Sequence, residues 1–256
     1  MKITDWDATD SAYIKDLTEN DLCANWEQLH LADAEPLPEG ELLKAWLLFH
    51  QGHYEQAAIS ALELGNQALP VLMRSVVAYT DYVEEDEDVS TDLLQQAYSH
   101  AEDALSNEHS TNAAFTTALC MGRYAQQLSI VKALKEGLGN KVKNLLAKSL
   151  GDNPNHAEAH IAMAMYHAEI IDKVGSMIGG LTYGACADTA RDHLEKGLAL
   201  APSAINLIEA GNAYLLLDGE KKGMKKATAL YQQAAECDAL DCLQSMDVDF
   251  AADQIA

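Results

Sequence analysis

The chain has 256 residues and a formal net charge of −23, from 40 acidic against 17 basic side chains. This charge repels phosphate backbones and anionic membrane surfaces, which argues against nucleic-acid binding as the main activity. Only 5 prolines and 15 glycines interrupt the chain, no run alternates polar and apolar residues over strand length, and no apolar run is long enough to span a bilayer. We therefore expect an all-α protein.

The amino terminus and the cysteines bear on the compartment. Residues 1–7 lack a basic segment followed by an apolar one, so we expect no signal peptide. The five cysteines are odd in number and scattered, which argues against a disulfide framework. These features favour a reduced, cytoplasmic protein.

Residues 1–36 are expected to form an N-terminal capping region. They contain one amphipathic stripe of helical spacing, with Asn20 available as its N-cap. Residues 42–49 then begin a first helical hairpin, and residues 52–57, which contain a glycine, an aromatic residue and a small residue, are expected to form its turn.

A second hairpin is predicted from about Pro70 to Asn107. The acidic run 84–88 separates its two helices, and Ser90 or Thr91 would cap the second helix. The run lacks the alternating oxygen ligands and the glycine of a calcium loop, so we interpret it as a solvated loop.

The middle of the chain is predicted to hold a third hairpin and a glycine-rich insertion. The hairpin spans 111–151 and divides near 137–140, and Asn155 would cap the next helix, 156–174. The glycine-rich residues 175–184 that follow are expected to end this helix and to form a connecting loop.

A last hairpin ends at about Cys237, and a terminal helix over 239–256 would cover the end of the stack. The second helices of the hairpins share a spacing of four and then three residues, in which the first and the last residue are small. The spacing occurs in Ala190, Leu194 and Gly197, in Ala227, Tyr231 and Ala234, and in Ala97, Ala101 and Ala104.

These offsets make the chain resemble a tetratricopeptide-repeat (TPR) protein over roughly residues 38–240. The resemblance implies a right-handed α-solenoid of about five to six irregular hairpins, with repeats over 37–238 inside a single domain of residues 1–256 and capping helices at both ends. The stretches 166–170 and 181–185 are similar to a group of bacterial repeat proteins with no assigned activity.

Three histidines form the first candidate site. His156, His160 and His167 could lie along one helical stripe, where zinc would accept their imidazoles with Glu169 or Asp172 in support. The order of residues does not match the helical metalloprotease motif, so we favour packing or surface roles and predict no metal and no cofactor.

The insertion is the second candidate site, because Pro154 and Pro202 lie farther apart than a repeat requires. Its glycines and hydroxyls could wrap an anion, although a plain connecting loop is the simpler interpretation. A third candidate is a nucleophile at Cys186 with His193 seven residues later, for which a buried structural cysteine is the favoured alternative.

We expect a non-enzymatic scaffold that binds a peptide or protein in the concave groove of the repeats, with no catalytic residue, no nucleic acid and no membrane insertion. The alternative is an accessory protein that binds a small molecule or metal through residues 173–185, like the T-component proteins of TRAP transporters. An enzyme centred on Cys186 or a histidine is least favoured.

The expected groove should prefer neutral or basic ligands, and the protein should be a monomer or a small homo-oligomer, for which exposed apolar residues at 174–181 would provide a self-association patch. The residues predicted to bind a ligand or partner are His160, Met163, Tyr166, His167, Glu169, Lys173, Thr182, Tyr183, Asn206, Glu209 and Asn212.

Overall fold

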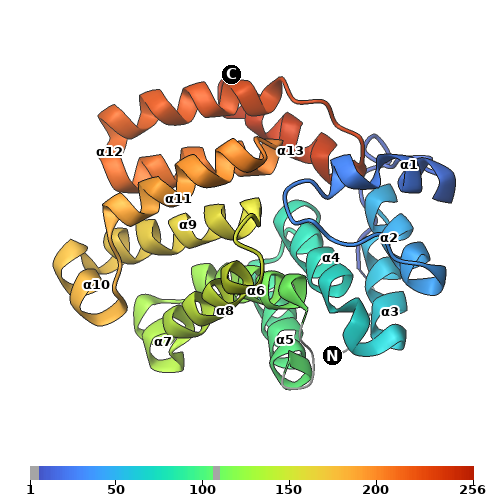
Figure 1. Cartoon of the computed structure of the whole chain (residues 1–256), viewed down its shortest axis with the longest axis horizontal. Coiled ribbons are helices and arrows are strands. Elements are labelled where there is room, and N and C mark those ends of the chain that lie inside the picture. Colours follow the sequence, from blue (N-terminus) through green and yellow to red (C-terminus); the bar gives the residue numbers. More distant parts are fainter. Residues whose placement is uncertain (1–5, 106–109) are drawn as a thin grey trace. The chain divides into compact units, whose positions relative to one another are not determined.

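The computed structural model describes residues 6–105 and 110–256, and every regular element in these residues is a helix (Figure 1). The prediction of an all-α protein is confirmed. The predicted end of the second hairpin at Asn107 lies outside the described residues.

The chain divides into two compact units. Unit 1 comprises Met1–His30, Ala34–Leu138 and Leu240–Leu243, and unit 2 comprises Leu31–Asp33, Gly139–Ala239 and Gln244–Ala256. The assignment of the whole chain to one domain stays a prediction.

In unit 1 the helices pack mainly against neighbours in the sequence: α2 against α3, α3 against α4, and α5 against α6. Gly52, with φ of 97°, ends α2 and allows α3 to begin two residues later, as the turn prediction requires. The helices are α1 (Glu19–Leu29), α2 (Gly40–Gln51), α3 (Tyr54–Leu64), the 3₁₀ turn η1 (Gly65–Ala68), α4 (Leu69–Tyr82), α5 (Glu87–Leu105), α6 (Thr111–Gln127) and α7 (Ile130–Glu136).

In unit 2 the helix α9 is central, because α10, α11 and α12 all pack against it. Gly219, with φ of 70°, breaks α12 into two helical segments, and the close approach of Gly223 to the Tyr214 carbonyl shows that the second segment folds back on the first. The elements are α8 (Leu138–Asp152), α9 (Ala157–Val174), α10 (Ser176–Tyr183), α11 (Ala187–Leu200), α12 (Ala204–Ala235) and α13 (Cys242–Asp253), of which the first residue of α8 and the first two residues of α13 belong to unit 1.

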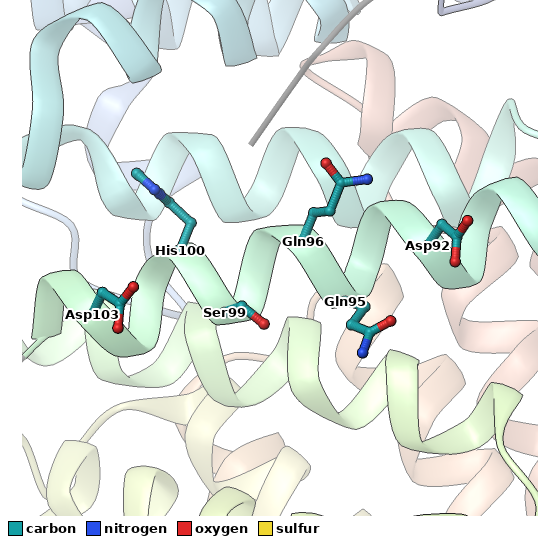
Figure 2. Close-up of a pocket in the computed structure, with 6 residues that line it drawn as sticks. All are labelled: Asp92, Gln95, Gln96, Ser99, His100 and Asp103. Carbon is teal, nitrogen blue, oxygen red and sulfur yellow. The ribbon is translucent and has the colours of Figure 1, made fainter.

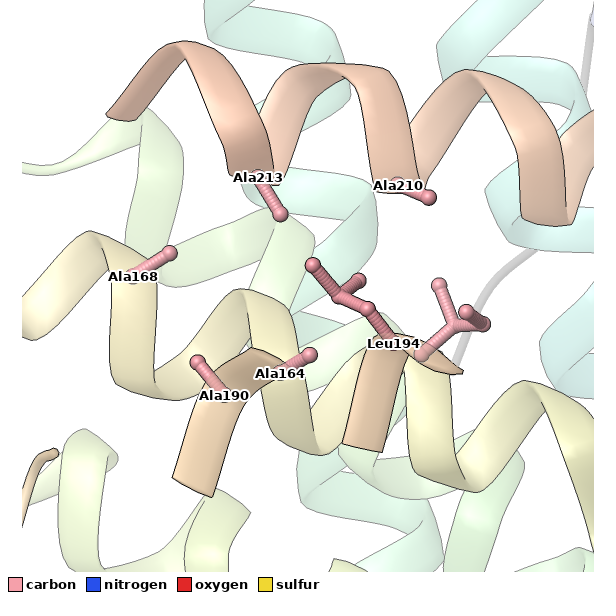
Figure 3. Packing of buried hydrophobic residues seen from close by; sticks show 7 residues of the cluster. Ala164, Ala168, Ala190, Leu194, Ala210 and Ala213 are labelled. Atoms are coloured by element: carbon pink, nitrogen blue, oxygen red, sulfur yellow. The ribbon is translucent and has the colours of Figure 1, made fainter. Parts of the chain in front are cut away.

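Small residues set the packing distance between these helices, as their spacing predicts. Figure 3 shows Leu194 among alanines contributed by α9, α11 and α12. A Cβ atom at Gly197 would lie 2.7 Å from Ile161 Cδ1, and one at Gly211 would lie 2.7 Å from Tyr231 Cε1. At both positions only glycine allows the neighbouring helix to lie this close.

Several local predictions in unit 1 are wrong about where helices begin. Thr18, rather than Asn20, caps α1 through a capping box with Asp21. The helix α5 begins at Glu87, before Ser90, because the Asp86 side chain accepts hydrogen bonds from the Asp88 and Val89 amides.

The remaining corrections concern the middle of the chain. It breaks at residues 128–129 and again at Gly137, so that α7 separates α6 from α8. His156, rather than Asn155, caps α9 by accepting a hydrogen bond from the Ala159 amide. The insertion is not a loop: residues 176–183 form α10, because glycines with positive φ at 175 and 184 end the flanking helical segments and leave a separate helix between them.

Candidate functional site

Histidines from α9 and α11 meet on the side of unit 2 where these helices pack together. The Nε2–H of His160 donates to the Pro154 carbonyl at 3.0 Å, which leaves Nδ1 of His160 to accept from Nδ1–H of His193 at 2.7 Å. The His167 ring centroid lies 6.4 Å from that of His193. Since α9 supplies positions seven residues apart and α11 supplies the third ring, helical periodicity brings the three rings together.

These three imidazoles are held neutral. Burial is the main cause that lowers the pKa of each ring, and it takes the pKa of His167 to about 4. The neighbouring ring of the cluster lowers the pKa of His167 and His193 further. The cluster therefore presents lone pairs and N–H donors rather than positive charge at neutral pH.

Two of the residues predicted for the insertion site, Tyr166 and Tyr183, meet at the carboxyl end of α10. Lys143 Nζ donates to the Tyr183 carbonyl at 2.7 Å, and the Tyr166 hydroxyl donates to it at 3.2 Å. His167 accepts a hydrogen bond from the Cys186 amide at 3.4 Å. The structure thus brings Tyr166, His167 and Tyr183 together, and it adds Lys143, which the sequence did not single out.

Other predicted residues of α9 and α10 lie apart from this group. Glu169 and Lys173 form an ion pair one turn apart on α9, with 3.6 Å between Oε2 and Nζ. Met163 is buried, whereas Thr182 is exposed.

The predicted residues of α12 have different roles. Asn206 is buried and its amide donates to the Ala201 carbonyl at 2.9 Å, so this side chain holds the junction between α11 and α12. Asn212 accepts a hydrogen bond from the Tyr231 hydroxyl at 2.6 Å. Glu209 and Asn212 are half-buried and so keep part of their surface in contact with solvent.

Cys186 is exposed at the start of α11, not buried as its favoured interpretation assumed. Hydrogen bonds from Thr189, the backbone amide foremost, lower the pKa of its thiol. Its amide, rather than its sulfur, contacts the histidine cluster through His167.

No group of three or more His, Cys, Asp or Glu side chains within residues 6–105 and 110–256 is arranged to hold a metal ion. Of the helices in the described part of the chain, none is both long and apolar enough to cross a membrane.

A second surface lies on α5 in unit 1, where the sequence analysis placed no site residue. A shallow groove of about 550 Å³ is lined by polar side chains that recur at helical spacing along one face, as Figure 2 shows: Asp92, Gln95, Gln96, Ser99, His100 and Asp103. The signal that could have found it is this uninterrupted polar stripe, together with the absence of lysine and arginine from Glu87–Leu105.

A buried polar chain in unit 1 is the other feature that the sequence did not indicate. His50 Nδ1–H donates to Asp241 Oδ2 at 2.6 Å, and the His50 and His30 Nε2 atoms lie 3.2 Å apart. Trp26 stacks on His30, and Trp46 stacks on His50. The three polar side chains are almost fully buried, so they hold structure together and offer no surface to a ligand.

The family model RMD1-3, described as regulator of microtubule dynamics protein 1-3, matches residues 44–244. The chain belongs to this family. The matched range runs from α2 to the beginning of α13, so the RMD1-3 family assignment covers both the histidine cluster and the α5 groove.

The fold of this RMD1-3 family chain also occurs in a solved structure. The crystal structure of TTC0263, a thermophilic TPR protein of Thermus thermophilus, superposes with a TM-score of 0.56 and covers 83% of this chain and 97% of that chain. Because the two chains are only 16% identical in sequence, this match shows a shared fold alone. A comparison with curated protein sequences gave no match. The predicted TPR-type helical-repeat fold is confirmed.

Proposed function

We propose that this protein is a non-enzymatic scaffold that binds a neutral or basic segment of a partner protein. The observation that carries the proposal is the polar groove of α5, in which two carboxylates, two amides, a hydroxyl and an imidazole line one helix face. Helical-repeat proteins bind extended or helical segments on such faces, and the side chains of this face can both accept and donate hydrogen bonds.

The charge distribution supports a neutral or basic partner. Unit 1 contains 24 of the 40 acidic residues but only seven of the 17 basic ones, and the α5 groove belongs to this unit. Opposite charge raises the association rate and disfavours acidic competitors. The description of the RMD1-3 family concerns microtubule dynamics. If this chain acts in such a process, the partner surface that contacts the α5 groove has to be neutral or basic.

In unit 2 we propose that the solvent-accessible residues among those predicted provide a further contact: Glu169, Lys173, Thr182, Glu209 and Asn212. The buried members, among them His160, His167 and Asn206, would position these residues rather than touch a partner. We also propose a reducing, cytoplasmic environment, which the five free cysteines support.

A peptide-binding experiment tests the role of the α5 groove. Two labelled helical peptides of equal length and apolar content, one rich in lysine and one rich in glutamate, are titrated with the protein, and fluorescence anisotropy is measured. We expect the basic peptide alone to bind. Substitution of Asp92→Asn with Asp103→Asn should weaken it about tenfold, because two charged contacts are lost.

The matched control changes the same charge on exposed positions of unit 2, Asp192→Asn with Asp253→Asn. It should leave affinity within about twofold of the wild type, because a distant surface charge is largely screened. An equal loss in both double variants would mean that net charge, not the groove, attracts the peptide. Binding of the glutamate-rich peptide would contradict the proposal outright.

A further inference from the structure

The helix α10 exposes large apolar side chains. Met177 is 76% exposed, Ile178 56% and Leu181 85%. The helix Ser176–Tyr183 contains no charged residue. Contiguous apolar surface of several hundred Å², which three such side chains provide, marks interaction sites on soluble proteins.

This exposed face belongs to a helix that is fixed in place. A Cβ atom at Gly179 would lie 3.1 Å from Ile170 Cγ2 and 3.5 Å from Ala185 Cβ, so the inner face of α10 packs closely on its surroundings. At the carboxyl end, Lys143 and Tyr166 both donate hydrogen bonds to the Tyr183 carbonyl. The apolar side chains are therefore presented to solvent by an anchored element.

The shape of the outer face of α10 is complementary to itself. Ser176 and Gly180 are exposed and lie four residues apart, which makes a shallow column without bulky side chains; the column ends at Gly184, where Lys143 Nζ lies 2.9 Å from the position of a Cβ atom. Met177 and Leu181 form a ridge directly beside this column. Ridges of side chains four residues apart pack into the grooves of a facing helix, so two copies of this face can interdigitate.

We propose that α10 is a self-association surface whose occupant is α10 of a second copy of this chain. The two helices pair about a twofold axis, with Leu181 of each copy lying over Gly180 of the other. In an isologous contact the same patch of both copies meets, so a charge on the patch would face a like charge near the twofold axis and the two would repel. Because α10 carries no charge, two copies meet there without this penalty although each chain carries −23.

The same observations disfavour an anionic membrane as the occupant. An anionic membrane would be repelled by the net charge, and α10 offers no lysine or arginine to attract it. A stable dimer buries about 800 Å² on each partner, roughly twice what the three side chains expose. The association is therefore reversible and concentration-dependent, and added salt strengthens it by screening the repulsion between the acidic chains.

Sedimentation velocity of the full chain tests the proposal, from about 5 to about 500 μM protein and at low and high salt. We expect a monomer–dimer equilibrium that shifts toward dimer at high salt. Met177→Gln with Leu181→Gln should raise the dissociation constant about tenfold or more, because the ridge loses its apolar contacts. Val131→Gln is the matched control, because Val131 on α7 is also 76% exposed.

The variant Gly180→Leu distinguishes a specific helix pair from non-specific hydrophobic association. It adds exposed apolar surface, and the nearest atom to a Cβ there is the Ala185 carbonyl oxygen at 3.6 Å, so the fold accepts the side chain. A filled column should weaken the dimer, whereas non-specific association would increase. A monomer at every concentration, an equal loss in Val131→Gln, or a stronger dimer in Gly180→Leu would each overturn the proposal.

Discussion

Substitution of Asp241 by alanine tests the buried polar chain that joins residues 240–243 to the hairpin of α2 in unit 1. The carboxylate accepts the Nδ1–H of His50 at 2.6 Å, and both side chains are at most 5% exposed. Alanine removes the acceptor and leaves an N–H donor in a site that water does not reach.

The expected cost follows from these contacts. A hydrogen bond to a charged group contributes about 1.5–3 kcal/mol, and an orphaned buried donor adds its desolvation penalty, so Asp241→Ala should lower the free energy of unfolding by about 3–4 kcal/mol. Asp241→Asn keeps an amide oxygen as acceptor for the same N–H. It should lose only about 1 kcal/mol.

Tryptophan fluorescence is a selective probe for this measurement, because Trp6, Trp26 and Trp46 all belong to unit 1. Trp46 stacks on the His50 ring itself. Urea titrations of the wild type and both variants give the two losses at pH 7. Equal losses in the alanine and asparagine variants, or a loss below about 1 kcal/mol in the alanine variant, would refute the assignment of the hydrogen bond as the stabilising contact.

Three further results are expected. Gly197→Val should destabilise unit 2 by about 2–3 kcal/mol, measured by far-UV circular dichroism melts, because the valine side chain would collide with Ile161. Gly151→Ala is the control and should not destabilise unit 2, because no atom lies within 4 Å of a Cβ at Gly151. Burial lowers the pKa values of His50 and of the α9–α11 histidines, so below about pH 6.5 the unfolded chain binds more protons than the folded chain and the free energy of unfolding should fall. His167→Gln should make this fall smaller between about pH 6.5 and about pH 4, the pKa of His167. Urea titrations at several pH values measure the effect. Cys186 should react rapidly with iodoacetamide at neutral pH, and more slowly in Thr189→Val, which removes the hydroxyl that helps to lower the thiol pKa. Cys120 is buried and its thiol pKa is raised, so it should react only on unfolding. Peptide mass spectrometry distinguishes the two sites.

The spacing of small residues was sufficient to predict how neighbouring helices pack. Ala190, Leu194 and Gly197 are buried on α11, and the same offsets place Ala227 and Ala234 at no exposure on α12. This succeeds because interhelical distance depends on side-chain size at positions four and three residues apart, which a sequence states directly.

The polar clusters could not be predicted, because they depend on tertiary proximity. His50 and Asp241 are 191 residues apart in the chain, and no local pattern relates them. His193 was noticed only as a partner of Cys186, yet its contact is with His160 from another helix. Helical spacing predicts which residues share a face, but not which face of another helix lies opposite.

The insertion shows a different limit of local reasoning. Glycine has a low helix propensity, so a segment with four glycines between 175 and 184 favours a loop. In the structure only Gly175 and Gly184 adopt positive φ, whereas Gly179 packs within α10 against Ile170. Tertiary packing on one face stabilises a helix that the propensity of its residues would not.

The two surfaces proposed as contacts have opposite physical character, and this makes them separable. The α5 groove lies in the acidic unit and would attract a basic segment over a distance, so added salt should weaken that binding. The α10 face carries no charge, and its pairing works against the net charge of −23, so added salt should strengthen it. A single salt series on one preparation therefore moves the two interactions in opposite directions. If both moved together, one surface would account for both interactions.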